Sequence, residues 1–73
     1  MNKNKTDFIR YDLMPIAGEF ADDYDWDAIA DEAGEYDAGR GWHMREDIQS
    51  DIDANGYSDE LNAIMATYDL TNN

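Results

Sequence analysis

The sequence contains no cysteine and only one histidine, His43. It therefore cannot form a disulfide or a thiolate metal site, and a zinc site would need carboxylates for nearly every ligand. No apolar run approaches the length of a membrane-spanning helix, and no apolar signal core follows the first five residues. We expect a cytoplasmic protein that has no membrane segment, binds no metal and carries no cofactor.

Basic residues are scarce, because only five Lys and Arg accompany 18 Asp and Glu, which gives a formal net charge of −13. So few cations cannot form a nucleic-acid-binding surface, and the carboxylates around them would repel phosphate. A chain of 73 residues forms one domain at most and is too short to build a deep catalytic cleft. We therefore expect one acidic domain over residues 1–73, with residues 1–5 and 69–73 frayed, that is not an enzyme and does not bind nucleic acid directly.

Apolar residues recur at the three- and four-residue steps of a helix, and no segment shows the two-residue alternation of a strand. The first stripe continues past Pro15, although proline removes a helix hydrogen bond and clashes with the preceding turn. The other stripes predict helices from about Asp25 to just before Gly39, over 45–54, and from a Ser58 cap onward. The pattern predicts an all-α, compact bundle of three to five short helices, with the first helix kinked or split near Pro15.

The same stripes predict the core, in which truncating one side chain to alanine should cost about 2–5 kcal/mol. The expected core residues are Ile9, Leu13, Phe20, Ile29, Ile48, Ile52, Leu61, Ile64 and Tyr68.

An acidic run from Glu19 to Asp37 contains nine carboxylates and no basic residue. Within the predicted second helix, Asp27, Asp31 and Glu35 share one face, where each like-charged pair is destabilising by roughly 0.2–0.5 kcal/mol. Drawn as a helix, the run carries one charge per roughly 3 Å, close to the roughly 3.4 Å between phosphates of a DNA strand. A cationic partner would relieve the repulsion, so we expect the partner-binding residues to be Asp22, Asp23, Tyr24, Asp25, Asp27, Asp31, Glu32, Glu35 and Asp37. The alternative interpretation is a solvated face that keeps a small protein soluble.

The stretch Glu19-Phe-Ala-Asp-Asp-Tyr-Asp-Trp-Asp-Ala-Ile-Ala-Asp-Glu-Ala33, together with the charge and size of the chain, resembles small acidic bacteriophage proteins that mimic DNA. These are the anti-restriction and anti-CRISPR inhibitors. The resemblance implies a non-enzymatic inhibitor that occupies the nucleic-acid groove of a basic target, with a CRISPR or restriction enzyme as the favoured partner. It also implies that the protein acts in the cytoplasm of the host cell.

Residues 51–62 carry a second pattern, which is similar to an EF-hand calcium loop. Position twelve of this loop is Asn62, however, where an EF-hand has a bidentate glutamate. The same letters also describe a helix stop at Asn55-Gly56 followed by the Ser58 helix cap. A calcium-binding helix-loop-helix module is therefore an alternative function, with the ligands Asp51, Asp53, Asn55, Tyr57 and Asp59. A third possibility is a small assembly protein that binds its partner through apolar surface.

Overall fold

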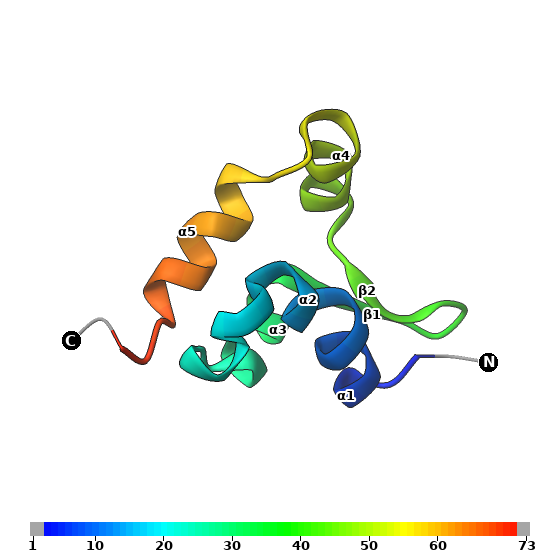
Figure 1. Cartoon of the computed structure of the whole chain (residues 1–73). Coiled ribbons are helices and arrows are strands. Elements are labelled where there is room, and N and C mark those ends of the chain that lie inside the picture. Colours follow the sequence, from blue (N-terminus) through cyan, green and yellow to red (C-terminus); the bar gives the residue numbers. More distant parts are fainter. Residues whose placement is uncertain (1–2, 72–73) are drawn as a thin grey trace.

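The computed structural model describes residues 3–71, which fold into short helices and one β-hairpin (Figure 1). Helix α3 packs against both the first helical segment and α5, while α4 connects the hairpin to α5. In chain order the elements are α1 (Lys5–Phe8), the π-helical η1 (Ile9–Leu13), α2 (Met14–Ala17), the 3₁₀-helical η2 (Gly18–Asp23), α3 (Trp26–Ala33), β1 (Gly34–Asp37), β2 (Gly41–Met44), α4 (Glu46–Asn55) and α5 (Asp59–Thr67).

The prediction of an all-α fold is wrong, because residues 34–44 form an antiparallel hairpin in which Gly34 pairs with Met44 and Asp37 with Gly41. The second helix was expected to continue almost to Gly39, but α3 ends at Ala33. Gly34 lies against the ring of Phe8, where an added Cβ would be 2.6 Å from Phe8 Cε2. The glycine thus lets the chain leave the helix and pass close to α1.

The first helical segment is interrupted directly before Pro15 by the π-helix η1. Proline lacks the N–H that a regular α-helix requires at this position, and the wider turn accommodates its ring. The Met14 N–H reaches back five residues to the carbonyl of Ile9, and Phe8 and Leu13, also five residues apart, are both fully buried. One additional residue in the turn rotates every later side chain by about 100° relative to a continuous α-helix.

That rotation explains why the core prediction is wrong for Phe20, whose side chain is 59% exposed. Ile16, which belongs to the same predicted stripe, is 47% exposed. The stripe was drawn with a constant helical period, and the π-helical turn changes its phase at Leu13. The end of α2 at Gly18, which has a φ of 59°, then directs η2 away from the helix axis.

Helices α4 and α5 begin and end close to the predicted residues. Gly56 has the left-handed φ of 83° and ends α4, and the Ser58 hydroxyl accepts a hydrogen bond from the N–H of Leu61 at the start of α5. Ser58 is buried, so this cap also satisfies a polar group in the core.

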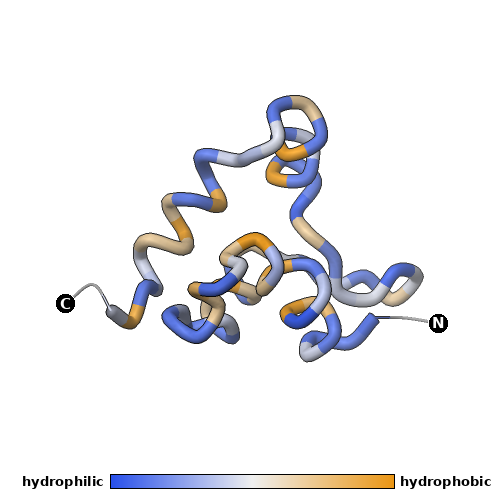
Figure 2. Tube along the Cα trace, in the orientation of Figure 1, coloured by the Kyte–Doolittle hydropathy of each residue, from blue (hydrophilic) through white to orange (hydrophobic). Residues whose placement is uncertain are grey.

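One apolar core joins the helices to the hairpin, and Figure 2 shows that hydrophobic positions alternate with hydrophilic ones along the chain that supplies it. Five of the predicted core residues are buried, and Ile9, Ile52 and Tyr68 pack against them while partly exposed. The buried apolar residues are Phe8, Leu13, Ile29, Ala30, Ala33, Met44, Ile48, Leu61, Ile64 and Met65.

Both ends of the described chain are hydrogen-bonded to the fold, and the fraying of residues 1–5 and 69–73 stays a prediction. The Lys3 carbonyl accepts from the N–H of Trp42 (2.8 Å), and the N–H of Leu70 donates to the Asp23 carbonyl (2.8 Å). Residues 1–2 and 72–73, which belong to the same expectation, lie outside the described residues. Among residues 3–71 no helix has both the length and the apolar character needed to cross a membrane.

Candidate docking surface

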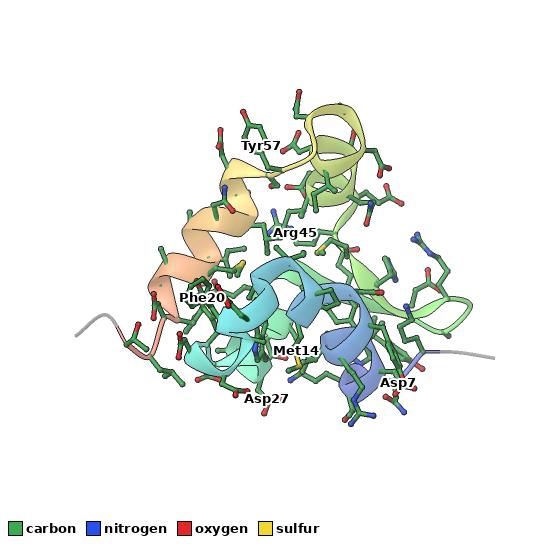
Figure 3. All side chains as sticks on the ribbon, in the orientation of Figure 1. Asp7, Met14, Phe20, Asp27, Arg45 and Tyr57 are labelled. Carbon is green, nitrogen blue, oxygen red and sulfur yellow. The ribbon has the colours of Figure 1, made fainter. Side chains whose placement is uncertain are left out.

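The few basic side chains are largely engaged by carboxylates of the same chain. Arg45 lies near the centre of the molecule (Figure 3), with its Nη2 2.7 Å from Asp47 Oδ2 and 3.3 Å from Glu60 Oε2. The hydrogen bond to Asp47 raises the pKa of Arg45 and lowers the pKa of the Asp47 carboxyl. Two further pairs are Lys3 with Asp12 (2.9 Å) and Arg40 with Glu46 (3.7 Å).

Lys5 on α1 neutralises part of the predicted acidic face. Its Nζ is 2.7 Å from Asp31 Oδ1 and 3.7 Å from Asp27 Oδ1, and it also lies 5.5 Å from the centre of the Trp42 ring. The hydrogen bond that Lys5 donates to the Asp31 carboxylate raises the pKa of Lys5. Lys5 therefore supplies, within the chain, part of the positive charge that we expected Asp27 and Asp31 to receive from a partner.

Glu35 and Asp37 do not extend that face, because α3 ends before them. Glu35 lies on β1 with its Oε2 3.9 Å from His43 Nε2, and the Asp37 carboxylate accepts a hydrogen bond from the N–H of Gly39 (2.7 Å) in the hairpin turn. The acidic run passes through a 3₁₀-helix, an α-helix and a strand. It therefore does not form the straight, evenly spaced row of charges on which the comparison with DNA spacing depended.

Two of the remaining candidates have structural roles at the ends of α3. The Asp25 carboxylate caps the helix by accepting from the N–H of Ala28 (3.3 Å), and Glu32 accepts a hydrogen bond from the Tyr68 hydroxyl (3.0 Å). The bond to Glu32 raises the pKa of Tyr68. Both carboxylates are still on exposed residues, so they add negative charge to the surface as well.

The last three candidates lie in and just after η2. Asp22 is exposed and Asp23 is half-buried. Tyr24 is half-buried as well, with its ring 5.3 Å from that of Trp26, and it forms an isolated antiparallel bridge with Asp69. This bridge places the acidic residues of η2 beside the chain that follows α5.

Two segments of the chain, residues 16–25 and 51–70, therefore contact each other, and we name this part of the molecule the acidic end. Ile16 lies beside the α4–α5 turn, and Tyr24 pairs with Asp69, so the first segment runs along α5 in the same direction. Neither segment contains Lys, Arg or His. The nine acidic residues of the acidic end are Glu19, Asp22, Asp23, Asp25, Asp51, Asp53, Asp59, Glu60 and Asp69.

Apart from Glu60, no acidic residue of the acidic end has an ion-pair partner within residues 3–71. Asp53 lies in the last turn of α4, where the helix dipole disfavours a carboxylate, and only the Gln49 amide donates to it (2.9 Å). Glu19 and Asp22 are three residues apart in a 3₁₀-helix, which places their like charges on the same side.

Large apolar side chains are exposed on the same surface. Figure 3 shows Tyr57 at the turn between α4 and α5 and Phe20 on η2 near α5. Their exposed fractions are 56% and 59%, and Ile16 and Leu70 of the acidic end are exposed as well. Exposed apolar groups surrounded by charged residues are typical of protein-binding surfaces.

The candidate calcium ligands do not form a loop. Asp51, Asp53 and Asn55 lie within helix α4, and Asp59 is the first residue of α5. The part of the chain that the structure describes contains no group of three or more acidic, histidine or cysteine residues placed to hold a metal ion. The helix stop and helix start account for the pattern at residues 51–62.

Comparison of the chain with protein families, curated proteins and solved structures gave no match.

Sequence reasoning found the acidic run but not the surface on which the unpaired charges gather. Glu19 and the acids of α4 and α5 were outside the predicted site, whereas Asp27 and Asp31 were at its centre. The absence of basic residues from 46–73 could have indicated the surface from the sequence alone. The position of Lys5 beside α3 could not be predicted, because it depends on a contact between residues 26 positions apart.

Proposed function

We propose that this chain is a non-enzymatic inhibitor whose acidic end docks on the basic, nucleic-acid-binding surface of another protein. The observation that carries the proposal is the distribution of charge. Four of the five Lys and Arg contact carboxylates of the chain, yet none of these cations belongs to the acidic end. A partner with Lys and Arg side chains would relieve this concentrated negative charge.

The exposed Phe20 and Tyr57 favour a protein as the partner. A simple cation would be attracted by the carboxylates but would gain nothing from aromatic side chains, whereas protein interfaces commonly bury aromatic anchors within a polar rim. Direct binding to nucleic acid is disfavoured, because phosphate would be repelled by a net charge of −13.

The mechanism that we propose is occlusion. Long-range attraction brings the acidic end to the positively charged groove of the target, and the bound protein then excludes the nucleic acid from it. The resemblance to phage DNA mimics makes a CRISPR or restriction enzyme the favoured target, encountered in the cytoplasm of an infected cell. We propose Glu19, Asp22 and Asp53 as the central contact residues in place of Asp27, Asp31 and Glu35, because the first three have no ion-pair partner within residues 3–71.

The proposal is tested by capturing proteins from bacterial lysate with the tagged chain and identifying them. Two double variants give matched controls, since each changes the net charge from −13 to −9. Glu19→Lys with Asp22→Lys alters the acidic end, and Asp7→Lys with Glu46→Lys alters acidic residues outside it. We expect nucleic-acid-binding proteins to be captured by the wild type and the second variant, and lost with the first. Equal capture by both variants would contradict docking through the acidic end.

A further inference from the structure

The acidic end contains a small apolar hollow where α2 meets the turn between α4 and α5. It is lined by Ile16, Ile52, Tyr57 and Leu61 together with Gly56, Ser58 and Asn62. Gly56 lines the hollow at the end of α4 and has a positive φ of 83°. Ile16 and Tyr57 stay about half exposed beside the hollow, so apolar surface that the fold leaves uncovered converges on one place.

The size of the hollow restricts what can occupy it. Its volume is about 100 Å³, whereas pockets for small-molecule ligands and cofactors usually measure about 300–1,000 Å³. Apolar walls offer few hydrogen bonds to orient a polar metabolite. A single aliphatic side chain presented by a larger molecule fits both the size and the chemistry.

The charges around the hollow determine the rest of the occupant. Asp53 precedes Gly56 by three residues, and Asp59 follows Tyr57 by two. Within the described residues neither carboxylate has an ion-pair partner. Lys or Arg side chains next to an apolar anchor would meet these carboxylates, whereas a second copy of this chain would bring like charge to the same place.

We propose that the hollow receives an aliphatic side chain from a basic amphipathic helix of the partner, with the lysines or arginines of that helix directed at Asp53 and Asp59. This inference rests on the proposed function for the basic character of the partner and adds the position and type of the anchor. Helices that lie in apolar grooves bind through a few anchors on one face, and a single anchor suits a hollow of this size.

The test uses two synthetic helical peptides with the same lysines, one with leucines along one face and the other with alanines in their place. Calorimetry at low ionic strength measures the affinity of each for the full chain. We expect the leucine peptide to bind at least about tenfold more tightly, because burying one leucine side chain is worth roughly that factor or more. Ile16→Ser combined with Tyr57→Ser should remove this preference. Tyr11→Ser should retain it, since Tyr11 is 63% exposed but lies on η1, outside the acidic end.

A second variant guards against unfolding of the first. Asn62→Phe places a large side chain in the lining of the hollow, and should abolish the leucine preference while the protein stays folded by circular dichroism. Equal affinity for the two peptides, or an unchanged preference in both hollow variants, would overturn the inference. Equal binding of the two peptides that weakens with salt would refute the inference about the hollow. It would still support docking through charge, so the proposed function would stand. Failure of both peptides to bind would also overturn the inference that the hollow receives an aliphatic side chain.

Discussion

Replacing Gly34 with alanine tests how the hairpin joins the helices. The new Cβ would lie 2.6 Å from Phe8 Cε2 and 2.8 Å from the Ala30 carbonyl oxygen, and Phe8 is fully buried and stacked on Trp42. The φ of −107° at Gly34 suits alanine, so the effect is steric. Overpacking of this kind costs about 1–3 kcal/mol. Alanine also reduces the conformational entropy of the unfolded chain, which stabilises the folded protein by about 0.4–1 kcal/mol.

The net loss is on the order of 1–2 kcal/mol, and each kcal/mol lowers Tm by about 4–8 °C in a domain of this size. Thermal unfolding followed by circular dichroism measures it. Gly39→Ala is the matched control in the hairpin loop, where the nearest atom is Oδ1 of the exposed Asp37 side chain at 3.3 Å, and its Tm should barely change. In a Phe8→Leu background the penalty of Gly34→Ala should shrink. A Gly34→Ala protein as stable as the wild type would refute the packing of β1 on α1.

Three further predictions concern stability. Ile48→Ala should lower the free energy of unfolding by about 2–5 kcal/mol because Ile48 is fully buried. Phe20→Ala should change it by less than about 1 kcal/mol, because Phe20 is exposed. Urea titration of both variants checks the corrected core. The hydrogen bond from Arg45 lowers the folded pKa of Asp47 below the usual value of 3.8, so its stabilisation is present above that pH and is lost as the pH falls through the folded pKa; Asp47→Asn should therefore lower Tm at pH 7 and match the wild type near pH 2. Calcium and magnesium at equal millimolar concentration should change Tm alike through screening, and a rise specific to calcium that Asp51→Ala removes would restore the calcium-loop interpretation.

Much of the helical structure was readable because local signals determine it. Gly56 and Ser58 end α4 and begin α5 through interactions within four residues of themselves, and the apolar steps at Ile48, Leu61 and Ile64 place those residues in the core. Such signals act whatever the remainder of the chain does, so the sequence alone predicts them.

The hairpin and the phase of the first helix were missed for the opposite reason. Gly34 falls inside the helix that was predicted from about Asp25 to just before Gly39, although its role is set by Phe8, which is distant in sequence. The helical stripe was extended through Pro15 to Phe20 at a constant period, and a single π-helical turn was enough to expose Phe20. The hairpin strands are too short to show a two-residue alternation, and the π-helical turn has no capping residue that would identify it.

The candidate site was predictable in its charge but not in its position. Composition identifies a chain with too few cations, and the fold then decides which carboxylates they neutralise. Lys5 contacts Asp27 and Asp31, while Glu19 and Asp22 remain unpaired within residues 3–71. That assignment moves the centre of the proposed docking surface from α3 to the acidic end.

Competition with nucleic acid is the most direct test of the central claim. A target captured by the chain is purified, loaded with a fluorescent oligonucleotide, and titrated with wild-type protein or the Glu19→Lys, Asp22→Lys variant while anisotropy is recorded. Occlusion predicts that the wild type displaces the oligonucleotide, more weakly as ionic strength rises, and that the variant does not. If the target holds the oligonucleotide at full affinity with this protein bound beside it, the acidic end does not occupy the nucleic-acid-binding surface.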